Sequence, residues 1–475
     1  MNTLKTIAKN TGWLMIADII SRVLSFFLII AIARYLGDSG LGKYSFVFAY
    51  VGLFSLFSDL GLSYFMVREV SRHKEKIQDY FGNILSLKLI LGILTIVAAL
   101  IIILFIDNSK ETVIGVLIIS FATLFLNFNT LFGALFQTFE KMEYISWMVI
   151  LERVITVSLG IYTLLHLSTI TTLFLVFLAS YFTIFCFSYI LAIKKITPFS
   201  FKFDVGFWKD LIKHSLPFWF TNLFIAIYFR IDAVMLSIMT NYEIVGWYSA
   251  AYKSLDALYF IPGSVIVAMF PVMSRLHITN KAVLKEVYEK AFYYLLLIAL
   301  PIGIGTTLLA ERIVLFVYKE KFINSVPALQ ILIWAEVIIF VSYLAGYLLN
   351  SINKEKLFTY TAGFGALLNI ILNLFLIYYF SYIGAAIATV ITELTIFVTL
   401  FYFATKYGYK INVFKIVIKP LIAAMVMTFA IFFLSSLHIL AIIIISALIY
   451  FSVLFLIRGV GKEEVDLIKL IIIKN

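Results

Sequence analysis

The stretch LPFWFTNLFIAIYFRIDAVMLSIM, residues 216–239, carries only two charged side chains, Arg230 and Asp232. At a rise of 1.5 Å per residue, a helix of this length crosses a hydrocarbon core of about 30 Å. Similar runs recur along the chain, which has 475 residues, 63% of them apolar and 13% charged. A soluble domain contains roughly 45–50% apolar residues, and the alternating pattern of a membrane β-barrel is missing from the sequence. The sequence therefore predicts an all-α integral membrane protein.

The apolar runs predict about fourteen transmembrane helices. Six of them precede the middle of the chain, six follow it, and a final pair completes the set. The expected ranges are 12–35, 43–66, 80–106, 112–136, 145–167, 170–193, 214–238, 245–272, 288–310, 327–350, 357–379, 382–405, 415–435 and 438–457.

The positions of Lys and Arg predict the orientation, because segments that face the cytoplasm carry an excess of them. If the N-terminus is cytoplasmic, most cations between helices fall on the cytoplasmic side. The opposite side then carries six cations, which are Arg34, Lys43, Lys110, Arg312, Lys319 and Lys321. We therefore expect a multi-pass protein of the cell membrane with both termini in the cytoplasm. Its formal charge of +11 is explained by contact with anionic lipid, and no nucleic-acid partner is expected.

The longest predicted cytoplasmic link, KKITPFSFKFDVGFWKDLIK (194–213), divides the chain near its middle. We expect an N-terminal six-helix lobe at 1–195, a cytoplasmic linker at 196–213 and a C-terminal six-helix lobe at 214–409. The final two helices and a cytoplasmic tail occupy 410–475.

The two predicted lobes share short motifs. Gly-x-Tyr-Ser occurs at 42–45 and again at 246–249, and Ser-Arg occurs at 71–72 and again at 274–275. Because each lobe has an even number of helices, the two copies have the same orientation in the membrane. This predicts a pseudo-two-fold axis along the membrane normal, with a central cavity between the lobes.

The same regions resemble a known family. The motifs are SRVLSF (21–26), ARYLG (33–37), GKYS (42–45), DLG (59–61), LP (216–217), RID (230–232), VGWYSAAY (245–252) and FPVMSR (270–275). They resemble the openings of the two lobes in polysaccharide flippases of the multidrug/oligosaccharidyl-lipid/polysaccharide (MOP) exporter superfamily.

This resemblance implies a transporter that moves a polyprenyl-(di)phosphate-linked oligosaccharide from the cytoplasmic to the outer leaflet by alternating access. The cargo would serve assembly of cell-surface polysaccharide or glycoprotein glycans, with other polysaccharide-assembly membrane proteins as partners and a lipid-tail groove at the last helix pair. The related lipid II flippase is only partly similar, because Leu28 stands where that carrier has a further arginine. A peptidoglycan precursor is therefore not the favoured cargo.

Charged side chains within the predicted spans are few. Each costs about 2.5–3.5 kcal/mol at a helix centre, so each is expected to face water, a partner or cargo. They are Asp18, Arg22, Asp59, Lys88, Glu152, Arg153, Arg230, Asp232, Lys253, Asp256, Glu336 and Glu393.

Spacing predicts which of these charges can pair. Asp18 and Arg22 are four residues apart, and Lys253 and Asp256 are three apart, so each couple can neutralise itself on one helix face. Arg230 and Asp232 project about 200° apart and cannot easily pair with each other. Their expected partners lie on the next helix, with Asp256 for Arg230 or Lys253 for Asp232.

Three cations are candidate contacts for a phosphate in the central cavity: Arg22, Arg230 and Lys253. Arginine can grip phosphate oxygens bidentately and lysine acts as a point charge, although purely structural ion pairs remain the alternative for all three. The acids are expected to be counter-charges or a site for a coupling H⁺ or Na⁺. They are Asp18, Asp59, Asp232 and Asp256.

Three further polar residues read as structural. Lys88 is expected to extend toward the cytoplasmic surface. Asn369 and Asn373, four residues apart, are expected to join neighbouring helices. Glu152, Arg153, Glu336 and Glu393 are left without an assigned role.

The sequence offers no enzymatic motif. With one cysteine, Cys186, it can form neither a disulfide framework nor a thiolate metal site, and it contains no Gly-rich phosphate loop. No catalytic residue, metal or cofactor is expected. An ion-coupled multidrug exporter of the same fold stays an alternative. A membrane glycosyltransferase or polymerase is disfavoured, because such an enzyme normally needs a large external loop, and the longest one here spans only 311–326.

Overall fold

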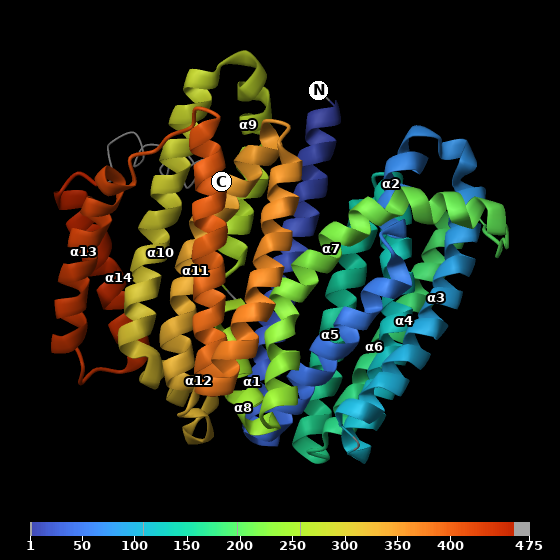
Figure 1. Ribbon diagram of the computed structural model, residues 1–475, viewed down its shortest axis with the longest axis horizontal. Coiled ribbons are helices and arrows are strands. Elements are labelled where there is room, and N and C mark those ends of the chain that lie inside the picture. Colours follow the sequence, from blue (N-terminus) through green and yellow to red (C-terminus); the bar gives the residue numbers. More distant parts are fainter. Residues whose placement is uncertain (1, 108, 197, 257, 460–475) are drawn as a thin grey trace. The chain divides into compact units, whose positions relative to one another are not determined.

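The computed structural model describes residues 2–107, 109–196, 198–256 and 258–459, with the side chains of 2–9, 11, 221, 267 and 268 outside that description. In these ranges the chain forms helices joined by short connections, without a strand (Figure 1). The α-helices are α1 (Asn2–Asp59), α2 (Leu62–Arg72), α3 (Ile77–Ile106), α4 (Lys110–Thr138), α5 (Met142–His166), α6 (Ile170–Lys195), α7 (Val205–Met239), α8 (Tyr242–Asp256), α9 (Phe260–Thr279), α10 (Lys281–Tyr318), α11 (Ser325–Ser351), α12 (Glu355–Lys406), α13 (Val413–Phe433) and α14 (Ile439–Leu456). Two short 3₁₀ helices, η1 (Lys74–Lys76) and η2 (Glu320–Phe322), complete the set.

Twelve helical segments of the described chain are long and apolar enough to cross a membrane, which confirms the all-α membrane fold. Two long helices contain an internal break. Gly37 interrupts α1 with φ 73° and ψ −169°, and Ser381 interrupts α12 with φ 54° and ψ −136°. Both breaks fall where the hydropathy pattern predicts a connection between two spans. The total of fourteen spans stays a prediction.

The expected helices 43–66 and 245–272 are each interrupted, so these two predictions were wrong. The first ends at Asp59, and Leu60 and Gly61 have left-handed φ values of 45° and 77° before α2 begins. Gly61 packs so closely that a Cβ there would lie 2.7 Å from the carbonyl oxygen of Ser215. The second expected helix is divided into α8 and α9. Hydropathy did not reveal either break, because the residues around both are apolar.

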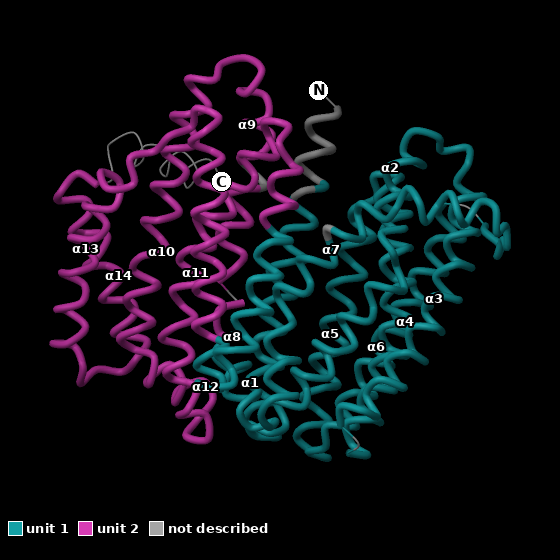
Figure 2. The backbone as a smooth tube through the Cα atoms, in the orientation of Figure 1, with its two compact units in different colours: residues 1–253, 362–385 teal, residues 254–361, 386–475 magenta. Residues whose placement is uncertain are grey.

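The described chain forms two compact units (Figure 2). Unit 1 contains residues 1–253 and 362–385, and unit 2 contains 254–361 and 386–475. One core of unit 1 joins apolar side chains of α2, α3, α4, α5 and α6 with the start of α7. Unit 2 has one core among α9, α10, α11 and the end of α12, and a second among α10, α13 and α14. The lobe boundaries expected from the sequence, at 195 and 214, stay predictions.

Within unit 1, the glycines of the repeated Gly-x-Tyr-Ser motif make a reciprocal contact. A Cβ on Gly42 would overlap the carbonyl oxygen of Tyr242, and a Cβ on Gly246 would overlap that of Asp38. Asp38 and Tyr242 each precede their own glycine by four residues, so each copy contacts the same position of the other. A contact of this kind is typical of two-fold symmetry. It supports the internal repeat inferred from the motifs.

Candidate functional site

Asp18 and Arg22 form the ion pair that their spacing predicts. Arg22 Nε lies 2.8 Å from Asp18 Oδ2 on α1, and the two side chains are 39% and 54% exposed, respectively. A pair this exposed contributes little to stability, typically below about 1 kcal/mol. Arg22 therefore keeps access to its surroundings while its charge is balanced.

Arg153 on α5 is a further cation in a membrane-spanning helix. Its Nε donates to Ser21 Oγ at 3.1 Å, and its Nη2 lies 3.5 Å from Glu152 Oε2. The Glu152 carboxylate also accepts a hydrogen bond from Thr156 Oγ1 at 3.1 Å. Arg153 is 25% exposed, and among the described residues its other N–H groups have no hydrogen-bond partner. Its guanidinium can therefore still bind a planar anion.

Arg230 on α7 lies against the second part of α1. Its Nη1 is 3.5 Å from the carbonyl oxygen of Phe48, and it approaches Gly52 so closely that a Cβ there would overlap it. Arg153 and Arg230 are both within electrostatic range of the hydroxyl of Tyr181, a buried residue of α6. The guanidinium groups of α5 and α7 are thus brought toward one tyrosine. Arg153 in turn contacts Ser21, the neighbour of Arg22.

Lys253 and Asp256 lie in the last turn of α8, where their spacing places them on one side of the helix. Lys253 is half-buried. Within unit 2, Asp256 lies in electrostatic range of the hydroxyl of Tyr318 on α10. The expected role of Asp256 as a counter-charge stays a prediction.

Lys88 does not extend to a surface, so that prediction was wrong. Its side chain is 1% exposed and its Nζ lies 2.5 Å from Asp59 Oδ1. The same ammonium group donates to Ser63 Oγ at 2.8 Å and to the carbonyl oxygen of Asn127 at 2.9 Å. Asp59 also accepts from Ser63 Oγ at 2.7 Å. These contacts join the end of α1 to the start of α2, to α3 and to α4.

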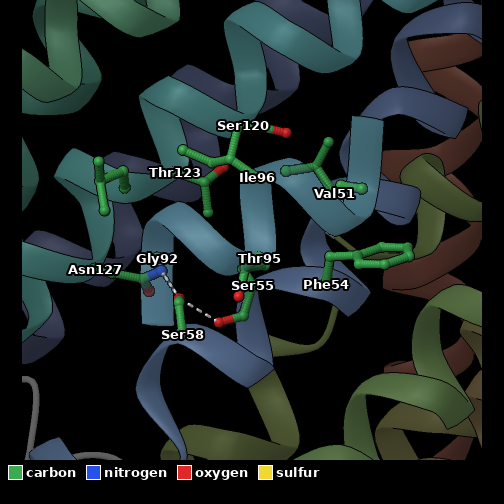
Figure 3. A pocket seen from close by; sticks show the side chains of 12 residues that line it. Val51, Phe54, Ser55, Ser58, Gly92, Thr95, Ile96, Ser120, Thr123 and Asn127 are labelled. Atoms are coloured by element: carbon green, nitrogen blue, oxygen red, sulfur yellow. Dashed lines mark hydrogen bonds between the residues drawn. The ribbon is translucent and has the colours of Figure 1, made fainter. Parts of the chain in front are cut away.

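A small cavity lies between α1, α3 and α4 (Figure 3). Its volume of about 10 Å³ is room for roughly one water molecule, whereas cavities for drug-sized ligands measure about 300–1,000 Å³. Ser58 Oγ accepts a hydrogen bond from Asn127 Nδ2 and donates to the carbonyl oxygen of Ser55 in its wall. This cavity is far too small for a sugar.

Asp232 occupies a buried polar cluster of unit 1. Its Oδ2 accepts a hydrogen bond of 2.6 Å from the hydroxyl of Tyr248, and its Oδ1 accepts one of 2.6 Å from Asn373 Nδ2. Asn373 Nδ2 also donates to Asn369 Oδ1 at 3.0 Å. Both asparagines are fully buried, and Asn373 joins α12 to α7. The predicted role as a link between helices is confirmed for Asn373.

Outside the spans, Asp107 follows α3 and contacts the start of α8. Burial raises the pKa of this carboxyl group, but hydrogen bonds from Tyr242, Ser109 and Thr112 outweigh that effect and hold the pKa below its usual value. Tyr242 also lies 3.2 Å from Thr112 Oγ1. The contact ties the loop between α3 and α4 to the motif that contains Gly246. Hydropathy could not reveal it, because the partners are 135 residues apart.

The sequence and fold both match known proteins. The model of the polysaccharide biosynthesis protein family matches residues 7–277, and the MatE model matches residues 217–375. Part of the chain is 24% identical to the uncharacterized membrane protein MJ1068 of Methanocaldococcus jannaschii. That match covers 225 residues, which are 46% of this chain and 44% of the relative.

Two solved structures share the fold at low sequence identity. The lipid II flippase MurJ in an inward closed conformation superposes with a TM-score of 0.78 and 18% identity, over 95% of this chain and 98% of that one. A multidrug resistance MATE family transporter of the MOP superfamily, inward-facing, superposes with a TM-score of 0.67 and 16% identity, over 81% of this chain and 95% of that one. With the sequence match over residues 7–277, the chain belongs to the polysaccharide biosynthesis protein family.

Proposed function

We propose that this transporter is a flippase for polyprenyl-(di)phosphate-linked oligosaccharides. It moves them from the cytoplasmic to the outer leaflet by alternating access, for assembly of cell-surface polysaccharide or glycoprotein glycans. The observation that carries the proposal is the presence of accessible guanidinium groups on membrane-spanning helices of unit 1. Arg22 is 39% exposed beside the Asp18 carboxylate, and Arg153 is 25% exposed with open donors.

Arginine suits this cargo because the N–H groups of its planar guanidinium can donate hydrogen bonds to two phosphate oxygens at once. Arg22, Arg153 and Arg230 come from α1, α5 and α7, so a phosphate held by them would be gripped from several helices. Lys253 on α8 would add a point charge from the second repeat. Tyr44 and Tyr181 lie near Arg153 and can offer hydroxyl groups and ring faces to a sugar.

We further propose that Asp232 takes part in coupling to H⁺ or Na⁺. Asn373 Oδ1 and Asn369 Nδ2 are buried without a hydrogen-bond partner among the described residues, and such atoms are costly to leave unpaired. The Asp232 carboxylate and the two amide oxygens form an oxygen-rich set, which is the chemistry that hard cations prefer. Asp18, Asp59 and Asp256 act as counter-charges in this scheme.

The second candidate function is an ion-coupled multidrug exporter. It is favoured by the MatE match over residues 217–375, which contain Asp232 and Asp256. An exporter of organic cations would use these acids for its substrate, and the arginines would then be structural. In either scheme the protein acts in the cell membrane with both termini in the cytoplasm, and the flippase would work beside other polysaccharide-assembly membrane proteins.

The deciding experiment is transport in reconstituted vesicles. Wild type is compared with Arg22→Ala, Arg230→Ala and Lys253→Ala, using a fluorescent polyprenyl-diphosphate sugar and, separately, a fluorescent organic cation. We expect the sugar lipid to be moved by wild type and transport to fall at least tenfold in each variant. Lys281→Ala, which removes an exposed lysine at the start of α10, is the matched control and should retain transport. Movement of the organic cation alone would establish the exporter instead.

A further inference from the structure

The first part of α7 is a helix that lies outside the membrane-spanning run. α7 begins at Val205, whereas the apolar membrane-crossing stretch within it begins at Leu216. Figure 1 shows this first part crosswise to α3, after which α7 turns into the direction of the other helices. Pro217 lies between the two parts, where its missing N–H favours a bend.

This first part has one buried and one exposed side. Leu211 and Ser215 are fully buried, and Phe207, Trp208 and Ile212 pack against the core of unit 1. The opposite side exposes polar and charged groups, which are Lys209, Asp210, Lys213 and His214. Such a pattern is typical of an amphipathic helix whose apolar face packs on the protein and whose polar face is exposed.

The segment that leads into α7 is fixed on the end of α3. Asp204 N donates to Asn83 Oδ1 at 3.0 Å, and Asp204 Oδ1 caps α7 by accepting from Phe207 N at 3.0 Å. Lys202 Nζ lies 2.5 Å from Asp79 Oδ1. The order of this segment therefore comes from polar contacts with its own unit.

Those contacts leave three neighbouring apolar side chains uncovered. Phe201, Phe203 and Val205 are 53%, 65% and 59% exposed. The two phenyl rings stack with their centroids 6.4 Å apart. Exposed aromatic groups beside lysines suit the boundary between lipid headgroups and acyl chains.

We propose that Phe201, Phe203, Val205, Lys209 and Lys213, here called the α7 foot, bind the headgroup region of an anionic lipid surface. The stretch 194–213 contains five lysines and two aspartates, so it is complementary to negative lipid. An acidic soluble protein would match the lysines but would leave the three apolar side chains without a purpose. A lipid surface accommodates both.

The foot has a mechanical consequence for the site. It is continuous with the part of α7 that carries Arg230 and Asp232. Ser215, which follows the foot in α7, packs its carbonyl group on Gly61 at the break between α1 and α2. Anionic lipid bound at the foot therefore holds the start of the helix that brings these two charges into the membrane. This inference is independent of the identity of the cargo.

The first test measures thermal stability of the full chain in neutral micelles titrated with phosphatidylglycerol or phosphatidylcholine. We expect phosphatidylglycerol to raise the unfolding midpoint more than phosphatidylcholine does. Lys209→Gln with Lys213→Gln should lose at least half of that selective rise. The control is Lys281→Gln with Lys285→Gln, two exposed lysines with the same spacing at the start of α10, which should keep it. Equal shifts with both lipids, or an unchanged rise in the Lys209/Lys213 variant, would overturn the proposal.

The second test locates the foot directly. In a Cys186→Ser background, Phe203→Cys is labelled with an environment-sensitive fluorophore and the protein is reconstituted into vesicles containing phosphatidylglycerol. Quenching by brominated lipid, with protection from aqueous iodide, is the expected result. Full access to iodide without quenching by lipid would show that the foot faces solution, and the proposal would then be discarded.

Discussion

Two carboxylate–cation pairs involving α1 contain similar groups in different surroundings. The pair of Asp18 and Arg22 is exposed, with both partners one helical turn apart. The pair of Asp59 and Lys88 joins α1 to α3, and its lysine is fully buried with additional hydrogen bonds to Ser63 and Asn127. The first pair can release its cation to an incoming anion. The second holds the break between α1 and α2 in place, and its charges are already satisfied.

The largest expected effect is on the buried pair. Asp59→Asn leaves the Lys88 ammonium buried without a counter-charge, and breaking such a pair typically costs about 3–5 kcal/mol. The unfolding midpoint in detergent should fall strongly. The double variant Asp59→Asn with Lys88→Met removes both charges and should recover most of the loss. A double variant as unstable as the single one would show that the loss does not come from the unpaired Lys88 charge.

Removing a charge from the exposed pair of Asp18 and Arg22 should affect transport much more than stability. Arg22→Ala is expected to lower transport of a polyprenyl-diphosphate sugar roughly tenfold or more, because a charge-assisted hydrogen bond contributes about 1.5–3 kcal/mol. Its stability should change by less than about 1 kcal/mol, since the pair is exposed. Both quantities are measured on one reconstituted preparation. A large loss of stability with normal transport would reverse the comparison between the two pairs.

A smaller effect is expected at Gly52. In Gly52→Ala the new methyl group would occupy the position of the Arg230 guanidinium, and this flexible side chain can move away at little cost in stability. Transport should fall a few-fold because Arg230 is displaced, while the unfolding midpoint stays near the wild-type value. Gly133→Ala is the control, because a Cβ there meets nothing within 4 Å. Equal transport by both variants would show that the position of Arg230 is unimportant.

The smallest effect concerns Asp107, an acid stabilised by neutral donors. Because its pKa is held below its usual value in the folded protein, it contributes stability that is complete above the unfolded pKa of about 3.9 and is lost as the pH falls through the folded pKa. Asp107→Asn should therefore lower the unfolding midpoint slightly at neutral pH. The difference from wild type should shrink below about pH 4. A difference that stays constant across this range would exclude the carboxylate as its source.

Local patterns in the sequence predicted what depends on local geometry. Hydropathy indicated the helices, and a spacing of four residues predicted the contact between Asp18 and Arg22. The partners of Lys88 and Arg153 could not be predicted in this way. Lys88 meets Asp59 because α3 packs beside α1, and Arg153 meets Ser21, which lies 132 residues away.

The polar contacts between helices of unit 1 also could not be predicted in full from local sequence patterns. The sequence suggested that Asn369 and Asn373 join helices, and the structure identifies Asp232 as the partner of Asn373 across 141 residues. Spacing within one helix contains no information about which neighbouring helix supplies such a partner. The position of Arg230 against Gly52 also depends on how α7 crosses α1. These contacts require the tertiary arrangement.

The reciprocal approach of Gly42 and Gly246 also bears on how α1 and α8 can move. Where two helices touch through bare backbone, no interlocked rotamers have to be rearranged when one rolls on the other. At such a crossing only backbone contacts, and no interdigitated side chains, oppose movement of one helix against the other. A methyl group on either glycine would overlap the backbone of the facing helix and push the two helices apart.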